Sequence, residues 1–415
     1  MELQNPVPES EAAEWVAAMV TTFLGNPYDD DFTRRVERWR REWLPERTWG
    51  FHDGTRWIGT LATEPRTVTI PGRDGSTVDI ESDAVTGVTV AATHRRRGLL
   101  TRMITPALQA AKDRDDPFSV LIAAEWPIYG RFGYAPATHA ANYTYFPRHR
   151  NASVLPIDGG TVRQVPAGDL GPIAPELFDR ARRRRQGQVD RRGLWWSKRL
   201  GLDGFETIGP QPHWMLHEGP DGPDGLLAWK VTRDFELDGA LGAIEVEDFT
   251  ATSDMAYQNL WAYLAGIDVV DEIAVREAAP DEPVRWLMRD GRALRQTFLG
   301  DDTWLRLLNV PAALSARGYA SAGRLVLEVV DADLGGYAAG RYLLDGSADG
   351  ASCASTRAPA DLRLSQRALA SAYLGTYSLR QLAPGGGVVE LTSGAMSRFD
   401  AMFATPIRPW NATGF

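Results

Sequence analysis

The sequence predicts an α+β fold that is divided into two or three domains. The chain has 415 residues, of which 44% are hydrophobic, and this length exceeds what a single hydrophobic core usually supports. Helical patterns come first and strand patterns follow them, as in α+β proteins. A similar succession of strands and a helix recurs after residue 160. We therefore expect a repeated unit that is followed by a third region.

The first domain is expected to span residues 1–150. Apolar spacing predicts two helices, three strands, a helix and a strand, which cover in turn residues 9–24, 32–44, 48–52, 57–63, 80–90, 99–112 and 119–124. Residues 147–160 are rich in Pro, Gly, Asp, Asn and Arg, a composition typical of a linker. This linker marks the end of the first domain.

The second domain, residues 151–291, repeats this order coarsely, and the third domain covers residues 292–415. In the second domain we expect strands over 161–165, 213–217, 225–231, 243–249 and 271–277, and a helix over 254–264. In the third domain, alternating apolar residues predict a small sheet from 324–330 and 337–343, with helices over 364–374 and 395–404. Gly375 then stands where a C-terminal cap belongs.

An apolar strand that ends at Val90 leads through three consecutive arginines into a helix. Free backbone N–H groups at a helix start, the positive end of the helix dipole and the guanidinium groups of Arg95, Arg96 and Arg97 converge there. Gly98 lacks a β-carbon, so the chain can turn tightly and a ligand can approach its backbone. The segment predicts a pyrophosphate site. The alternative is a basic, exposed helix start without a ligand.

Two motifs together resemble a known family. THRRRGLL at 93–100 is followed about thirty residues later by IYGRFGY at 128–134, and this pair is similar to the Eis family of bacterial acetyl-CoA-dependent N-acetyltransferases, which belong to the GCN5-related superfamily. LRLLNVPAALSARGY at 305–319, AYLG at 372–375 and an end in Phe415 are similar to the same family. Leu100 departs from the small residue of the acyl-CoA loop motif.

The resemblance implies two tandem GCN5-related acetyltransferase lobes, the second of them degenerate, and a C-terminal sterol carrier protein-like domain in a homohexamer. Only the first lobe should bind acetyl-CoA, because residues 249–255 of the second lack glycine and arginine and include Asp254, which would repel phosphate. Backbone groups of Val88 and Val90 should pair with the pantetheine arm, and the Val88 amide is the candidate oxyanion donor. The cofactor residues that we expect are Val88, Thr89, Val90, Arg95, Arg96, Arg97, Gly98, Leu99, Leu100, Thr101, Ala124 and Glu125.

The resemblance also assigns two catalytic groups. Tyr129 would be the general acid that protonates the leaving thiolate, and the α-carboxylate of Phe415 would be the general base. A buried core role, as we expect for Phe132 and Tyr134, is the alternative for Tyr129. The segment before Phe415 contains a second large aromatic residue, Trp410, which favours a docked tail over a solvated one.

For the acceptor, the resemblance points to the first two helices and the turn between them. Aromatic and acidic residues there would bind a cationic amine such as an aminoglycoside, a polyamine or a lysine side chain. The expected residues are Phe23, Asp29, Asp30, Asp31 and Trp39. The alternative for the three acids is capping of the second helix. A longer acyl-CoA, or a lipid or CoA carrier without turnover, are the alternative functions.

Composition excludes several other classes of protein. The net charge of −9 argues against a nucleic-acid partner, and the arginine run at 180–185 is interpreted as a salt-bridged surface. We find neither a membrane-spanning stretch nor a secretory leader and expect a cytoplasmic enzyme. The single cysteine, Cys353, excludes an internal disulfide. His213 and His217 lack a metal-binding motif, so we expect no metal.

Overall fold

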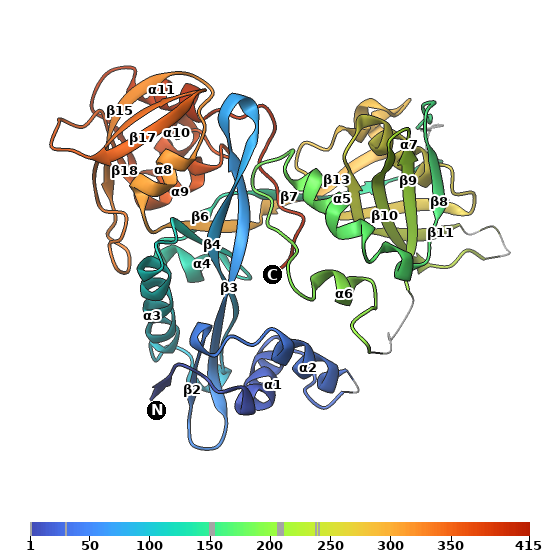
Figure 1. Ribbon diagram of the computed structural model, residues 1–415, viewed down its shortest axis with the longest axis horizontal. Coiled ribbons are helices and arrows are strands. Elements are labelled where there is room, and N and C mark those ends of the chain that lie inside the picture. Colours follow the sequence, from blue (N-terminus) through green and yellow to red (C-terminus); the bar gives the residue numbers. More distant parts are fainter. Residues whose placement is uncertain (1, 30, 149–153, 206–210, 237–238, 240) are drawn as a thin grey trace. The chain divides into compact units, whose positions relative to one another are not determined.

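The computed structural model describes residues 2–29, 31–148, 154–205, 211–236, 239 and 241–415. The chain forms two compact units (Figure 1). Unit 1 comprises Met1–Ala137, Thr303–Pro406 and Gly414–Phe415, and unit 2 comprises Thr138–Asp302 and Ile407–Thr413. Among the described residues, no helix has the length and the apolar character that a membrane span requires.

The first sheet of unit 1 has seven strands in the order β1-β2-β3-β4-β5-β14-β6. Its strands are β1 (Leu3–Gln4), β2 (Thr48–His52), β3 (Trp57–Pro71), β4 (Thr77–Val90), β5 (Phe118–Ile122), β6 (Ala135–Pro136) and β14 (Thr303–Leu307). The predicted strands of this region are confirmed, but β3 and β4 extend well beyond the predicted 57–63 and 80–90. They form a long antiparallel ribbon that pairs out to Pro71 and Thr77.

Three longer helices accompany this sheet: α1 (Ala12–Thr22), α2 (Phe32–Arg41) and α3 (Leu99–Asp113). Met103, Ala107 and Ala111 recur every four residues along one stripe of α3, close to the 3.6-residue period, and they are buried with Phe51 and Trp304 in one core cluster. The helices α1 and α2 belong to a second cluster, which includes Trp15 on α1, Trp39 on α2 and Trp43, which follows α2. The predicted helices are confirmed, with α1 and α2 somewhat shorter than expected.

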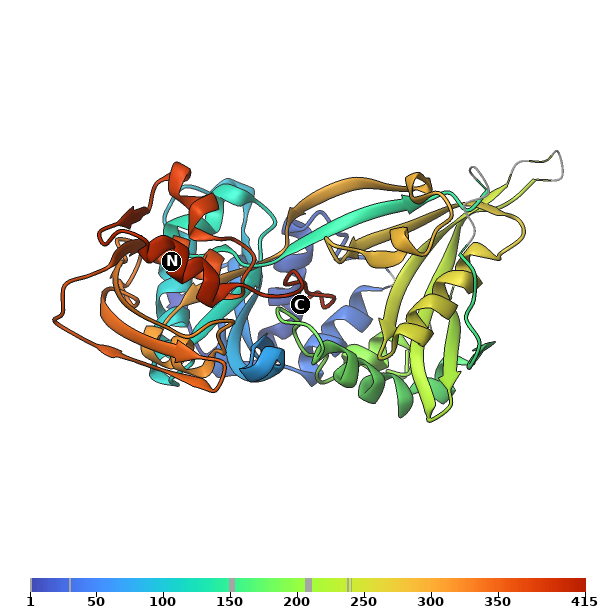
Figure 2. The same cartoon turned by 90° about the horizontal axis from the view of Figure 1, so that it is seen from above.

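The second sheet of unit 1 has the order β17-β16-β15-β18-β19. It consists of β15 (Gly323–Val330), β16 (Gly340–Ser347), β17 (Gly350–Ser355), β18 (Leu362–Ser365) and β19 (Val388–Glu390), and is accompanied by the helices α8 (Val310–Ala316), α9 (Gln366–Tyr373), α10 (Leu379–Leu382) and α11 (Ala395–Phe403). Figures 1 and 2 show these helices against the sheet. The predicted small sheet is confirmed. Gly375 follows α9 with φ at +92°, as the cap prediction requires.

Unit 2 contains one sheet in the order β13-β7-β12-β11-β10-β9-β8. Its strands are β7 (His139–Tyr145), β8 (Thr161–Gln164), β9 (His213–Gly219), β10 (Gly222–Arg233), β11 (Gly242–Ala251), β12 (Val270–Ala278) and β13 (Leu294–Asp301), with the helices α5 (Ile173–Arg182), α6 (Trp195–Arg199) and α7 (Asp254–Ala265). The predicted strands and helix of this region are confirmed. The strand β11 pairs in parallel with β12, and α7 connects them, which is the same arrangement as β4, α3 and β5 in unit 1.

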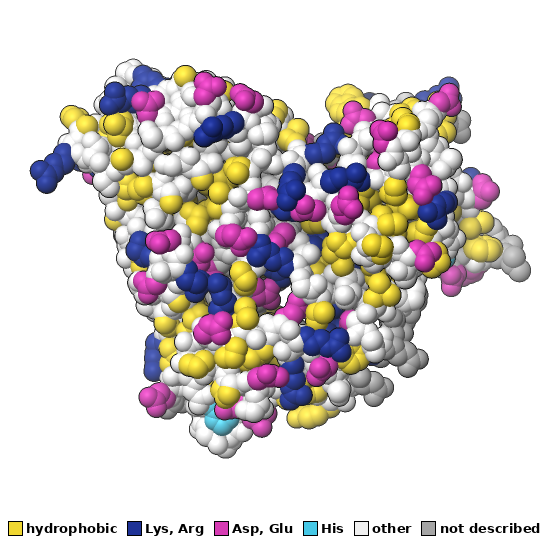
Figure 3. Space-filling model, in the orientation of Figure 1, with side chains coloured by type: hydrophobic (Ala, Val, Ile, Leu, Met, Phe, Trp, Pro, Cys, Tyr) yellow, Lys and Arg dark blue, Asp and Glu magenta, His cyan; other side chains and the backbone are white. Residues whose placement is uncertain are grey.

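The arginine run at 180–185, which begins in the last turn of α5, is salt-bridged. Asp179 pairs with Arg182 at 2.7 Å and with Arg183 at 3.0 Å, and Arg185 pairs with Asp281. Basic and acidic side chains are interspersed over the face of the molecule in Figure 3. These ion pairs agree with the predicted salt-bridged surface.

Candidate active site

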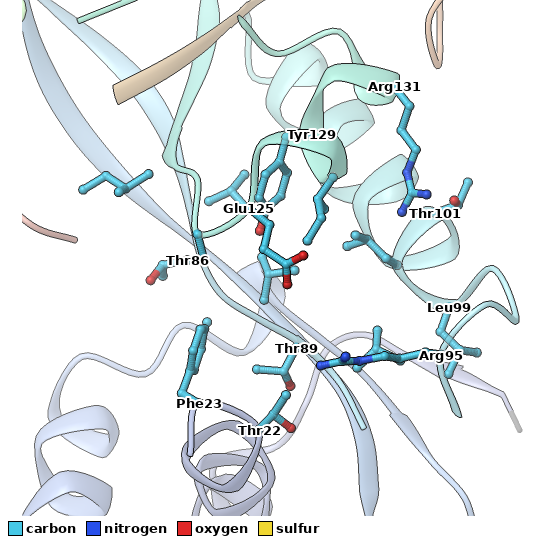
Figure 4. Close-up of a pocket in the computed structure, with 18 of the residues that line it drawn as sticks. Thr22, Phe23, Thr86, Thr89, Arg95, Leu99, Thr101, Glu125, Tyr129 and Arg131 are labelled. Atoms are coloured by element: carbon cyan, nitrogen blue, oxygen red, sulfur yellow. The ribbon is translucent and has the colours of Figure 1, made fainter. Parts of the chain in front are cut away.

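A pocket of about 870 Å³ lies within unit 1, beside the strands β4 and β5 (Figure 4). This volume is typical of a small-molecule site. Thirteen of the lining residues are among the candidate cofactor, acid and acceptor residues of the sequence, and the last residue of the chain also lines the pocket. The lining residues are Thr22, Phe23, Val85, Thr86, Gly87, Val88, Thr89, Val90, His94, Arg95, Arg96, Gly98, Leu99, Leu100, Thr101, Ile122, Ala124, Glu125, Ile128, Tyr129, Arg131, Gly414 and Phe415.

The pocket begins where the parallel strands β4 and β5 separate. They pair only at Asp83 with Ser119 and at Ala84 with Val120. From Val85 to Val90, the edge of β4 that faces away from β3 has no strand beside it among the described residues. A strand edge of this kind offers N–H and C=O groups to an extended ligand.

The point of separation is fixed by a buried carboxylate. The side chain of Asp83 is fully buried and lies 2.6 Å from Arg47 and 2.7 Å from Arg114. Burial raises the pKa of Asp83 to about 6, although the two arginines act to lower it. Ser119 donates a hydrogen bond from its hydroxyl to the backbone carbonyl of Asp83 at 2.9 Å. The last residues that the two strands share are thus held by side chains as well as by the backbone.

The strand β4 bulges where it passes the pocket. Its register against β3 shifts between Thr60 and Ala62, and Gly87 there has φ at +60°. A β-carbon on Gly87 would lie 3.0 Å from Trp15 and 3.4 Å from Trp39. Glycine is therefore required at this position both by the backbone conformation and by the tryptophans behind it.

The arginine turn follows β4 and leads into α3. Arg96 and Gly98 both have left-handed backbone conformations, with φ at +63° and +74°. Gly98 is the N-cap residue of α3, and no side chain among the described residues caps this helix. The first N–H groups of α3 therefore remain available to an anion. Arg95 and Arg96 line the pocket, and in Figure 4 Arg95 extends toward Thr89.

Arg97 differs from its two neighbours. It is absent from the lining of the pocket, and its guanidinium donates a hydrogen bond of 3.4 Å to the carbonyl of Thr93 within the same turn. All other predicted cofactor residues line the pocket.

Tyr129 ends the short helix α4 (Trp126–Tyr129), which is followed by a 3-10 turn, η5 (Gly130–Phe132). Its ring is 7% exposed and packs edge-on against Tyr134 with a centroid distance of 6.2 Å. The hydroxyl of Tyr134 shares a 2.7 Å hydrogen bond with Ser119, whereas the hydroxyl of Tyr129 has no hydrogen-bond partner among the described residues. Burial, assisted by the charge of Glu125, raises the pKa of Tyr129 to about 12. The hydroxyl of Tyr129 is therefore protonated at neutral pH and able to donate to a ligand.

The pocket is lined from several sides. Figure 4 shows the side chains of Tyr129 and Glu125 on one side and those of Thr22 and Phe23, at the end of α1, on the opposite side. Gly414 and Phe415 also line it. In unit 2 the preceding segment is held by hydrogen bonds, because the indole of Trp410 donates to the carbonyl of Glu277 at 2.8 Å.

Of the predicted acceptor residues that the structure describes, only Phe23 lines the pocket. Asp29 pairs with Arg35 at 2.5 Å and Asp31 with Arg34 at 2.9 Å. Asp31 occupies the N-cap position of α2, but its side chain makes no capping hydrogen bond. Trp39 stacks in the tryptophan cluster, 5.3 Å from Trp15. Asp30 lies outside the described residues.

Several lining residues were not predicted from the sequence. Arg131 is the most important of them, since it adds a third guanidinium to the pocket; its place within IYGRFGY was the available signal. The bulge at Gly87 carried no sequence signal of its own. The other missed lining residues are Thr22, Val85, Thr86, His94, Ile122, Ile128 and Gly414.

The equivalent position in unit 2 is built differently. There β11 and β12 pair over a longer stretch, from Gly242 with Val270 to Val246 with Val275. The helix α7 that follows is capped, because the hydroxyl of Ser253 accepts a hydrogen bond from the amide of Ala256, and Asp254 lies in its first turn. A capped and acidic helix start does not favour phosphate.

The two histidines singled out in the sequence take part in local packing. His213 stacks on Trp229 at a centroid distance of 4.2 Å, and Nδ1 of His217 lies 2.5 Å from a carboxylate oxygen of Asp224. In the described part of the chain, no group of three or more His, Cys, Asp or Glu side chains is arranged to hold a metal ion.

Comparisons with known proteins agree with this architecture. Residues 5–137 and residues 187–307 each match a family model described as an acetyltransferase (GNAT) domain, and residues 310–412 match a sterol carrier protein domain. The chain is 38% identical over 414 residues to a protein of Streptomyces griseus named as an N-acetyltransferase, with 97% of each chain covered. It is 32% identical to the N-acetyltransferase Eis of Mycobacterium tuberculosis over 86% of each chain.

Solved structures show the same relationship. The crystal structure of Eis1 from Mycobacterium abscessus matches over the full length of both chains, with a TM-score of 0.84 and 29% identity. A GCN5-related N-acetyltransferase from Anabaena variabilis shares the fold over the full length of both chains, with a TM-score of 0.83 and 21% identity. The chain therefore belongs to the Eis family of GCN5-related N-acetyltransferases, and it is an acetyltransferase with two GNAT domains and a sterol carrier protein domain.

Proposed function

We propose that this enzyme transfers the acetyl group of acetyl-CoA, bound in the pocket of unit 1, to an amine of a cationic acceptor. One observation carries the proposal: a free strand edge, an uncapped helix start with two arginines, and a tyrosine hydroxyl without a hydrogen-bond partner among the described residues line the same pocket. GNAT acetyltransferases use acetyl-CoA as the acetyl donor. Each of the three features meets a different part of that molecule.

The extended pantetheine arm would pair with the edge of β4 through backbone groups of Val88 and Val90. The amide of Val88 would donate to the carbonyl oxygen of the thioester, where negative charge develops. The pyrophosphate would be held by the N–H groups at the start of α3 together with Arg95 and Arg96. Ala124 and Glu125 would line the opposite wall. Arg97, which bonds within its own turn, would contribute only its charge.

Tyr129 would assist departure of the thiolate. With a pKa near 12, its hydroxyl keeps its proton at neutral pH and donates it, or a strong hydrogen bond, to the sulfur as the carbon–sulfur bond breaks. The α-carboxylate of Phe415 would take the proton that the acceptor nitrogen loses as its new bond to the acetyl carbon forms. Phe415 lines the same pocket as Tyr129, which supports this assignment.

The acceptor would enter as an amine beside Phe23 and Glu125. An exposed aromatic ring and a carboxylate both attract a cation. Aminoglycosides, polyamines and lysine side chains all fit this description.

Three further expectations stay predictions. They are the domain boundaries at residues 150 and 291, a homohexameric state and a cytoplasmic location.

Substitution Gly98→Asp should weaken acetyl-CoA binding at least about tenfold, because a carboxylate at the start of α3 would oppose the pyrophosphate. Isothermal titration should give one site per chain for the parent protein. Gly394→Asp is the matched control: Gly394 is also a left-handed N-cap glycine with no atom near its missing β-carbon, but it precedes α11. Two sites per chain, or equal affinities of the two variants, would contradict the assignment.

Substitution Tyr129→Phe should lower kcat by about 10²–10⁴-fold, the usual contribution of a general acid, with little change in affinity for acetyl-CoA. Tyr134→Phe removes the hydroxyl of the neighbouring ring, which bonds to Ser119, and should lower the melting temperature instead. Steady-state kinetics and thermal unfolding of both variants distinguish these effects. If the Tyr129→Phe enzyme has the parental kcat, Tyr129 is not the general acid and has only a structural role.

Extension of the chain by a few residues beyond Phe415 should cut kcat while preserving folding and acetyl-CoA affinity, because only the position of one carboxylate changes. An extension of equal length at the other end of the chain serves as the control. If the extended protein has an unchanged melting temperature and acetylates amines at the parental rate, the α-carboxylate of Phe415 is not the base.

A further inference from the structure

A fully buried arginine lies behind the candidate acid. Arg306, on β14, has a side chain with no solvent exposure. One terminal nitrogen of its guanidinium donates to the backbone carbonyl of Phe132. The other donates to the carbonyl of Leu334 at 2.6 Å and to a carboxylate oxygen of Asp331 at 3.3 Å. The ring of Tyr337 lies 5.3 Å from the guanidinium carbon.

These contacts reach the turn that carries Tyr129. Phe132 is the last residue of η5, which begins immediately after Tyr129, and the amide of Tyr134 donates back to the carbonyl of Tyr129 at 3.3 Å. Gly133 has φ at +83°, and a β-carbon there would lie 1.4 Å from a terminal nitrogen of Arg306. The guanidinium therefore occupies the space that a side chain at 133 would need, and it fixes the end of the turn.

The second set of contacts of Arg306, with Asp331 and Leu334, lies in the sterol carrier protein domain. Asp331 also accepts from the amides of Ala338 at 3.0 Å and Asp333 at 3.2 Å. Its carboxylate thus organises the connection between β15 and β16. Leu334 and Tyr337, in the same connection, pack against the core cluster that contains Tyr129.

Stability alone does not account for this pair. Both side chains of the Arg306–Asp331 ion pair have no exposure, and the desolvation of two charges offsets most or all of their attraction. The planar guanidinium of Arg306 is instead held in one orientation, because its N–H groups donate to carbonyl groups on two different segments. That geometry joins the turn after Tyr129 to the β15–β16 connection.

We propose that Arg306 is a positioning residue for the acid Tyr129, and that the β15–β16 connection of the sterol carrier protein domain supports the active site through it. The proposal rests on the proposed function, because it needs Tyr129 to act in the transfer step. It gives the third domain a role in catalysis that does not require a lipid ligand.

The test is Arg306→Lys, which keeps the positive charge beside Asp331 but removes the fork that reaches Phe132. We expect kcat to fall by at least about tenfold, since small displacements of a reacting group carry large penalties, while KM for acetyl-CoA changes less than about twofold. Arg317→Lys is the matched control. Arg317 is 1% exposed and bonds to the carbonyls of Tyr373 and Phe403, so its replacement should lower the melting temperature and leave kcat near the parental value.

A double-mutant cycle separates positioning from general damage. In the Tyr129→Phe background, Arg306→Lys should change kcat by less than about threefold, because the group that it positions is already absent. An equal loss of kcat in both backgrounds, or no loss in the parent, overturns the proposal. Failure of the proposed acid role is seen separately, as a Tyr129→Phe single variant with parental kcat, and it overturns this proposal too.

If Arg306→Lys does not fold, Arg306→Met combined with Asp331→Asn provides the second variant. It removes both buried charges together, and the amide oxygen of the asparagine can still accept from one of the two amides, Ala338 or Asp333, that bond to different oxygens of Asp331. The same loss of kcat, confined to the background that contains Tyr129, supports the proposal. A folded double variant with parental kcat overturns it.

Discussion

The early separation of β4 from β5 is the constraint on which the candidate site depends. The strand β5 makes two pairs with β4 but five with β14, from Ile122 with Thr303 to Phe118 with Leu307. A strand from late in the chain thus directs β5 away from β4 and leaves the β4 edge free. The same strand carries Arg306, which bonds to the turn after Tyr129. The opening of the pocket and the support of its candidate acid therefore come from one element.

The two GNAT domains share a topology, but this topology does not determine whether the helix start is free to bind an anion. Both contain a parallel strand pair that is joined through a helix. In unit 1 the helix start is uncapped and follows three arginines, whereas in unit 2 a serine hydroxyl satisfies the helix start and an aspartate follows it. Because backbone N–H groups at a helix start can serve a side chain or a ligand, a single capping residue decides which of the two they serve.

Much of the fold and of the pocket could be predicted because the signals are local. Apolar periodicity predicts the strand before the arginine turn and the helix after it. The three arginines and Gly98 between them predict a helix start that is open to an anion. The sequence could not predict that β7 lies in the sheet of unit 2 and β14 in the first sheet of unit 1, since each pairs with strands that are distant in the sequence. Asp29, Asp31 and Trp39 were expected in the acceptor site because the resemblance placed that site on the first two helices and their residue types suit a cation, but local ion pairs and the tryptophan cluster hold them. The positions of Arg306 and of the bulge at Gly87 could not be predicted either, because both depend on tertiary contacts.

Transfer of an acetyl group to an amine in this pocket is tested by measuring the amine-dependent release of free CoA. The purified protein is incubated with acetyl-CoA and a panel that contains an aminoglycoside, a linear polyamine and a lysine-containing peptide. Thiol release is followed by its colour reaction, and the amines are then examined by mass spectrometry. We expect CoA release above the amine-free rate with at least one amine of the panel, in an amount equal to that of the acetylated amine formed. Tight binding of acetyl-CoA with no amine-dependent release for any member would contradict this expectation.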